Sequence, residues 1–190
     1  MSDSANLAVL TICGSLRRGS YNAALARALP ALAPRDMTIT AAPSFSGFPL
    51  YNADLQASDG FPDDVMALGA AVREADGVIF VSPEYNFSIP GALKNAIDWI
   101  SRLEDQPLRN KPVALQSASP SPLGGARMQY HLRQVMVFVE AITFTRPEIF
   151  VMGAPGKFGE DGALTDETTR ELVAKQLAVF GDFIRRVGAT

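Results

Sequence analysis

The distribution of apolar residues along the chain predicts five β-strands. Residues 7–12 (LAVLTI) and 77–82 (GVIFVS) are almost continuous apolar runs, and turn-forming residues close each of them. Short runs without alternation are typical of parallel strands that are buried on both faces. Weaker strand patterns occupy residues 37–41, 112–117 and a stretch around 142–151. The chain therefore predicts a parallel sheet built around two strongly apolar strands.

Helical periodicity separates these strands. In residues 62–75 a proline stands in the first turn, and Val65, Leu68 and Val72 recur at helical spacing. Further helical patterns occupy residues 22–32, 91–103, 125–138 and 165–187. The alternation of strand and helix predicts a doubly wound α/β fold with helices on both faces of the sheet. We expect one domain over residues 1–190, in which residues 42–60 form the one long irregular segment.

Composition and net charge argue against several classes of function for this chain. The formal net charge of −3 argues against a nucleic-acid surface and gives no reason to expect a membrane partner. Cys13 is the only cysteine and His131 the only histidine, so we expect no disulfide, no metal site and few possible histidine-based triads. The chain shows no signal-peptide pattern and no apolar run of membrane length, which predicts a cytoplasmic protein.

Ligands of open α/β sheets bind beyond the carboxyl ends of the strands, where the strand order reverses. This rule directs attention to the loops after strands one, three and four. The first loop, GSLRRGSYN, leads directly into a predicted helix and is rich in glycine, serine and arginine. Free amides at the helix start, with Ser15, Ser20, Asn22 and Arg17, suit an anion such as a phosphate. The alternative is an ordinary helix start with Ser20 as its N-cap and solvated arginines.

Known phosphate motifs do not match this loop. The P-loop pattern fails because the only Gly-Lys pair, Gly156-Lys157, is followed by Phe158. The layout resembles a low-molecular-weight tyrosine phosphatase, which carries a Cys-x5-Arg loop after strand one. Here Arg18 stands one position too early for that motif, and the chain contains no Asp-Pro pair for the general acid. Cys13 therefore fits a small residue at a strand end better than a nucleophile.

The loops after strands three and four have equally unusual sequences. SPEYNFSIPGALKNAIDW begins at Ser82, and its Glu84, Tyr85 and Asn86 stand where a planar heterocycle can be stacked and hydrogen-bonded. Ser88 is a candidate cap of the helix that follows. SASPSPLGGARMQYHLRQ begins at Ser117 and offers either a close-approach loop before a helix or a plain proline-rich connector.

Together the three segments GSLRRGSYN, PEYNFSIPGALKNAIDW and GGARMQYHLRQ resemble the NADPH-dependent FMN reductase family, which includes quinone, azo-dye and chromate reductases. The resemblance covers most of the chain and implies a flavodoxin-like, five-stranded parallel sheet of order 2-1-3-4-5. It also implies a phosphate site at Ser15, Arg17, Ser20, Tyr21 and Asn22. A second group would surround the isoalloxazine ring, largely through the backbone: Pro83, Glu84, Tyr85, Asn86 and Ser117.

Other parts of the family pattern are less tightly tied to the flavin. The segment from Leu50 to Asn52 resembles a stretch that borders the pocket, and Phe87 is a position that can tune which acceptor enters. The resemblance also implies a homodimer or homotetramer with the flavin near a subunit interface. Candidate interface residues are Arg127, Tyr130 and Glu148.

The function implied is an FMN-dependent oxidoreductase with a ping-pong mechanism. NAD(P)H passes a hydride to the flavin and leaves, and an oxidised acceptor then takes the electrons. No side chain is predicted to be catalytic. The acceptor stays open among quinones, azo compounds, metal oxyanions and free flavin, as does the choice between NADPH and NADH. The alternatives are a flavodoxin-type electron carrier and a redox sensor without turnover.

Overall fold

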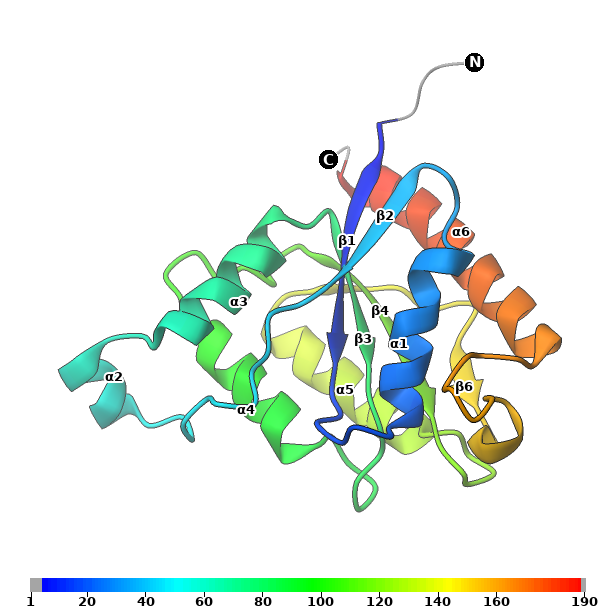
Figure 1. The fold of residues 1–190 in the computed structure, drawn as a ribbon. Coiled ribbons are helices and arrows are strands. Elements are labelled where there is room, and N and C mark those ends of the chain that lie inside the picture. Colours follow the sequence, from blue (N-terminus) through cyan, green and yellow to red (C-terminus); the bar gives the residue numbers. More distant parts are fainter. Residues whose placement is uncertain (1–4, 189–190) are drawn as a thin grey trace.

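The computed structural model describes residues 5–188 and confirms the predicted doubly wound architecture. Strands β1 (Leu7–Cys13), β3 (Gly77–Val81) and β4 (Pro112–Ala118) form the centre of an all-parallel sheet. β2 (Met37–Ala41) pairs with the other side of β1. The order β2-β1-β3-β4-β5 is the predicted 2-1-3-4-5, and the strands end at a common edge (Figure 1).

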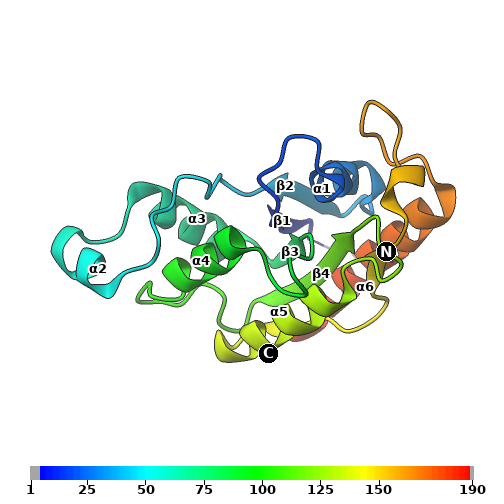
Figure 2. The same cartoon turned by 90° about the horizontal axis from the view of Figure 1, so that it is seen from below.

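Helices cover both faces of this sheet (Figure 2). α1 (Tyr21–Leu32) and α6 (Glu167–Gly188) pack on one face. α3 (Asp63–Glu74), α4 (Gly91–Ile100) and α5 (Ala126–Phe138) pack on the other. The predicted helices are confirmed, with ends that differ from expectation by a few residues. A short 3-10 helix, η1 (Ala154–Gly156), precedes α6.

Alternation along the buried strands supplies two separate cores. In β1, Leu7 and Val9 pack under α1 and α6, whereas Leu10 and Ile12 pack under α3 and α4. Successive side chains of a strand point to opposite faces of the sheet, so a continuous apolar run fills both layers. This is why the strongest apolar runs lie in the middle of the sheet.

The prediction of one continuous strand over residues 142–151 is wrong. β5 (Ile142–Thr143) pairs with the start of β4, and β6 (Ile149–Val151) pairs with its end. Between them stands Pro147, which has no amide hydrogen to donate to a ladder. The chain leaves the sheet there, so two short strands occupy the edge.

The prediction that residues 42–60 are irregular throughout is also wrong, because they contain α2 (Ala53–Asp59). No side chain of α2 is buried, so apolar periodicity does not mark it. Its signals are local instead. The Asn52 side chain accepts from the Asp54 amide at the start, and Gly60 ends the helix with a φ of 79°. α2 projects from the end of the molecule, away from the sheet (Figure 2).

Candidate functional site

The loops that follow β1, β3 and β4 enclose one cavity of about 160 Å³ at the carboxyl edge of the sheet. Most of the predicted site residues line it, and they come from the first two loops, which are distant in the sequence. These residues are Ser15, Arg17, Ser20, Tyr21, Asn22, Pro83, Glu84 and Tyr85, joined by Ala118, Ser119 and Pro120. Asn86 and Ser117, which were also predicted, do not line the cavity.

The first loop ends in the capped start of α1. Ser20 is the N-cap, and its Oγ accepts from the amides of Asn22 and Ala23 at 3.2 and 3.3 Å. The capping role considered for Ser20 is therefore confirmed. Arg17 lies just upstream with an exposed side chain. A cation beside the positive end of a helix creates a place that favours an anion.

The close approach of this loop to the sheet depends on Gly14. Its amide donates to the Val81 carbonyl at 2.9 Å, which extends the pairing of β1 and β3. A Cβ at Gly14 would lie 2.3 Å from the Ser82 Oγ, a separation that real structures do not tolerate. Glycine is therefore required where the first two loops meet.

Asn22 joins the first loop to the third. Its side-chain amide donates to the Ala118 carbonyl at 2.8 Å, and its Oδ1 accepts from the Ala118 amide at 2.9 Å. The residue is buried, with 3% of its surface exposed. Both ends of the side chain are thus engaged by backbone 96 residues away in the sequence. Its structural role is to hold the two loops at a fixed distance.

The second loop carries a tight hairpin from Tyr85 to Ser88. These two residues exchange backbone hydrogen bonds of 2.9 and 3.0 Å, and the two between them have positive φ, 50° at Asn86 and 64° at Phe87. This is the geometry of a two-residue hairpin turn. The hairpin presents Tyr85, which is 48% exposed, at the rim of the cavity and places Asn86 at its tip.

Ser88 does not cap α4, because that helix begins at Gly91 after Pro90. The Ser88 Oγ instead lies 2.8 Å from the Nδ1 of His131 on α5. No pattern in the sequence connects Ser88 with His131, which lies 43 residues away, since only the fold brings α5 beside the hairpin. His131 therefore supports the hairpin from outside the cavity.

The carboxylate of Glu84 is directed to the start of α5. Its Oε2 accepts from the Met128 amide at 3.2 Å, and its Oε1 lies 3.8 Å from the Arg127 guanidinium. The N-cap of α5 is Gly125, which has no side chain to cap the helix. Glu84 supplies the missing acceptor and negative charge. The one acid among the lining residues is therefore neutralised, which leaves Arg17 to set the charge of the cavity.

Ser117 is fully buried behind the cavity. Its Oγ donates to the Gly124 carbonyl at 2.6 Å and accepts from the Gln129 side-chain amide at 2.7 Å. Gly124 and Gly125 have φ values of 57° and 89°, so the turn depends on glycine. The Ser117 side chain thus fixes the third loop, and its neighbours Ala118 and Ser119 reach the cavity.

Several residues considered from the sequence lie outside the cavity. The Tyr51 amide donates to Asn95 on α4, and the Tyr51 ring packs edge-to-face on buried Trp99. The Arg127 guanidinium lies 3.9 Å from the centroid of the Phe87 ring. Two further interface candidates contact each other, since the Tyr130 hydroxyl lies 3.5 Å from a Glu148 carboxylate oxygen.

Cys13 does not have the properties of a nucleophile. Burial raises the pKa of its thiol, and this effect exceeds the opposing ones of the Ser15 carbonyl and the Arg27 charge. A neutral thiol is a poor nucleophile, which removes the main support for a phosphatase. Among residues 5–188, no group of three or more His, Cys, Asp or Glu side chains is placed to hold a metal ion. No helix in that same part of the chain has the length and apolar character to span a membrane.

The fold and the site define an α/β protein of the flavodoxin-like type, with a polar, cation-bearing cavity at the carboxyl edge of its sheet. A helix N-terminus, Arg17 and an exposed aromatic rim fit a nucleotide whose phosphate is anionic and whose ring is planar. The chain belongs to the NADPH-dependent FMN reductase family, whose model matches residues 7–155. The predicted family and class, an FMN-dependent NAD(P)H oxidoreductase, are thereby confirmed.

Individual relatives agree with this assignment. The chain is 50% identical over 185 residues to a quinone reductase of Escherichia coli, covering 97% of this chain and 98% of the relative. It is 44% identical to an NAD(P)H-dependent FMN reductase of Pseudomonas aeruginosa, covering 98% and 99%. Among solved structures, the flavoenzyme NAD(P)H:(acceptor) oxidoreductase FerB of Paracoccus denitrificans matches with a TM-score of 0.85 and 32% identity, covering 95% and 98%.

Proposed function

We propose that this protein is an NAD(P)H-dependent quinone reductase whose FMN is held by the three loops at the carboxyl edge of the sheet. When bound, FMN would supply the redox chemistry, which is the acceptance of a hydride from NAD(P)H and the transfer of two electrons to a quinone in a separate half-reaction. The protein contributes position and electrostatics. This division of labour explains why the cavity holds no obvious acid–base pair.

The phosphate end of FMN fits the first loop. Arg17 offers a charge-assisted hydrogen bond, and the start of α1 adds the positive end of its dipole. Ser15, Ser20 and Tyr21 complete the polar wall, and Asn22 fixes the distance to the third loop. A cavity of about 160 Å³ receives this end of the cofactor, so the ring would lie toward the open rim.

The isoalloxazine ring is proposed to lie against Tyr85 and the backbone of the second loop. Pro83 and Glu84 would shape this side largely through main-chain groups, with Asn86 at the tip of the hairpin beyond the cavity, and the backbone beside Ser117 would close the other side. Backbone donors near the ring stabilise negative charge that develops on reduction. The observation that carries the proposal is the convergence of these loops on one cavity in which Glu84 is neutralised and Arg17 is exposed.

The test is an anaerobic half-reaction experiment on purified protein loaded with FMN and desalted. We expect the flavin absorption to be retained, to bleach on addition of NADPH or NADH, and to return on addition of 1,4-benzoquinone. Retention without bleaching by either nucleotide would favour the electron carrier or the sensor. Loss of flavin on desalting would contradict the assignment of the cavity to FMN.

The oligomeric state is proposed to be a homodimer or homotetramer. The outer surface of α5 supports this, because Tyr130, Val137 and Phe138 are 54%, 76% and 77% exposed on one helix. Large apolar side chains gathered on one element are typical of protein interfaces. We further propose a cytoplasmic location, where NAD(P)H is available as the reductant.

A further inference from the structure

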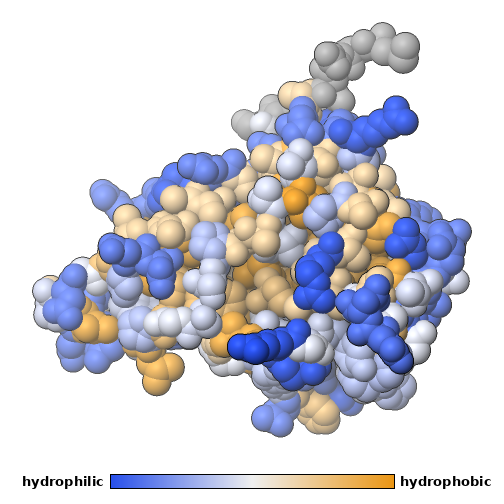
Figure 3. All heavy atoms as spheres, viewed as in Figure 1, coloured by the Kyte–Doolittle hydropathy of each residue, from blue (hydrophilic) through white to orange (hydrophobic). Residues whose placement is uncertain are grey.

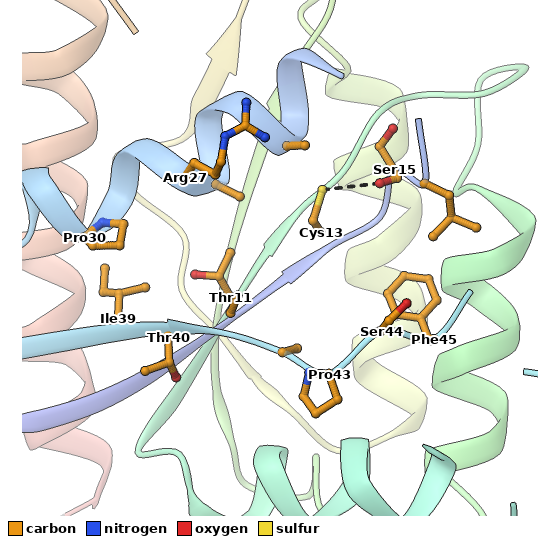
Figure 4. Close-up of a pocket in the computed structure, with 15 residues that line it drawn as sticks. Thr11, Cys13, Ser15, Arg27, Pro30, Ile39, Thr40, Pro43, Ser44 and Phe45 are labelled. Atoms are coloured by element: carbon orange, nitrogen blue, oxygen red, sulfur yellow. Dashed lines mark hydrogen bonds between the residues drawn. The ribbon is translucent and has the colours of Figure 1, made fainter. Parts of the chain in front are cut away.

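A second and larger cavity lies on the other side of the first loop. It measures about 450 Å³ and is enclosed by α1, the end of β1, and the chain from Ile39 to Phe45 (Figure 4). Ligand pockets in proteins typically measure roughly 300–1,000 Å³. Ser15 is the one residue that lines both this cavity and the candidate flavin site. In the space-filling view, a hollow with apolar atoms at its floor lies between α1 and the segment after β2 (Figure 3).

The cavity exists because two surfaces that face each other carry small side chains. On α1 these are Ala23, Ala26 and Pro30, which share one helix face because they are spaced by three, four or seven positions. On β1, the face that carries Leu7 and Val9 in the core continues as Thr11 and Cys13. The helix and the strand both carry small side chains where they face each other here. These side chains do not fill the space between the two elements, so a cavity remains.

A buried polar group in the wall lacks a partner. The Thr11 Oγ has no hydrogen-bond partner among the described residues, and Thr11 is 5% exposed. Figure 4 shows its side chain between α1 and β2, where it projects into the space they enclose. Buried hydroxyl groups almost always find a partner, because leaving one unpaired destabilises the folded protein. A polar atom of a bound molecule would satisfy this group.

The remaining wall defines the chemistry of that molecule. Ile39, Pro43 and Phe45 add apolar surface. Arg27 is the one charged residue among those that line the cavity, and its exposed guanidinium is turned toward Gly162 at the edge of a neighbouring cavity. We propose that this cavity binds a small apolar carboxylate, of about the size of naphthoic acid, at a site separate from the flavin. Its hydrocarbon part would lie against the alanines and Phe45. Its carboxylate would lie at the mouth of the cavity, where the exposed Arg27 side chain turns inward to meet it.

The protein carries a built-in reporter for this site, because its only cysteine lines the cavity. The experiment measures the rate at which N-ethylmaleimide alkylates Cys13 in the FMN-loaded protein, using mass spectrometry. Because burial raises the pKa of this thiol, the reaction is followed over hours at mildly alkaline pH, where part of the thiol is ionised. We expect 2-naphthoate to slow alkylation in a saturable manner. 2-Naphthylmethanol, which lacks the charge, should need about tenfold higher concentration for equal protection. Absence of protection by 2-naphthoate would overturn the proposal, and equal protection by the alcohol would overturn the carboxylate assignment.

Variants locate the bound molecule independently of the thiol. Equilibrium dialysis of 2-naphthoate should show binding abolished in Ala26→Leu, which fills the cavity, and unchanged in Ala31→Leu, which alters an exposed position of the same helix. Arg27→Gln should weaken binding about tenfold, whereas Arg35→Gln, an exposed arginine outside the cavity, should not. Retained flavin absorption verifies that each variant is folded. Full binding to a folded Ala26→Leu protein would place the molecule elsewhere and overturn the proposal.

Discussion

Arg17 supplies the positive charge of the candidate flavin cavity, because Glu84 is turned to the start of α5. We expect Arg17→Ala to weaken FMN binding by about ten- to a hundredfold, since a charge-assisted bond to phosphate is lost. Fluorescence quenching of FMN during titration measures the Kd. Arg18→Ala is the matched control, because Arg18 lies next in sequence but lines a different cavity. Equal losses in the two variants would contradict the assigned role of Arg17.

Asn22 shows what sequence reasoning misses at this scale. The family pattern implies a phosphate contact, but both ends of the side chain are bonded to Ala118. That partner is 96 residues away, so no local pattern reveals it. Ser20 was within reach of sequence reasoning, because a cap acts on amides two and three residues ahead.

The Asn22 contact leads to a stability prediction. Asn22→Ala leaves the amide and carbonyl of Ala118 without their partners in a buried place, and each loss costs about 1–3 kcal/mol. We expect the free energy of unfolding in urea to fall by about 2–4 kcal/mol. Asn52→Ala, which removes only the exposed cap of α2, should cost less. A smaller loss in Asn22→Ala than in Asn52→Ala would contradict this role.

Among the elements, the start of α6 depends on a carboxylate whose charge is held by its neighbours. Asp166 accepts from the Lys157 ammonium at 2.7 Å and from the Thr169 amide at 2.9 Å. The Lys157 bond first, and Thr169 second, lower the pKa of Asp166 from 3.8 to about 2. A lowered pKa in the folded state stabilises the fold above the unfolded value, and this contribution disappears as the pH falls through the folded value.

We therefore expect Asp166→Asn to lower Tm at neutral pH, because the variant keeps a capping oxygen but loses the charge. The Tm difference from the parent should shrink as the pH falls from about 4 toward 2, the interval between the unfolded and folded pKa values. Thermal unfolding followed by circular dichroism across this range measures the effect. Asp182→Asn, at an exposed position of α6 that is paired at 3.7 Å, should change Tm little at any pH. A Tm difference that stays constant with pH would rule out the charge as its cause.

Helices and strands could be predicted where the pattern of apolar residues reflects which faces are buried. β1 and β3 stand out because both faces of the strand are covered, and α3 because one face is. α2 was not predicted, because none of its side chains is buried and no apolar periodicity marks the helix. The split of the last strand depends on which residues on either side of Pro147 pair with β4, and that pairing is a tertiary relation.

At the scale of the whole molecule, one apolar surface is left uncovered by the rest of residues 5–188. Val137 and Phe138 are the most exposed apolar residues of α5, next to α4 and on the side of the sheet opposite α1. If copies of the chain associate through this surface, a charge placed in it must be desolvated on assembly, which is strongly unfavourable. We expect Phe138→Lys to shift the protein toward monomer in sedimentation velocity experiments at fixed concentration. Leu172→Lys, a 40% exposed position on α6, should leave the assembly unchanged.

Flavin content separates this prediction from a folding defect. Phe138 does not line the candidate flavin cavity, so a monomeric variant that keeps its FMN has lost association alone. Loss of FMN together with association, in a variant whose circular dichroism matches the parent, would indicate that a second copy helps to hold the ring beside Tyr85, the exposed aromatic at the rim. A parent protein that sediments as a monomer would contradict the proposed assembly. The cavity would then have to hold the whole cofactor within one chain.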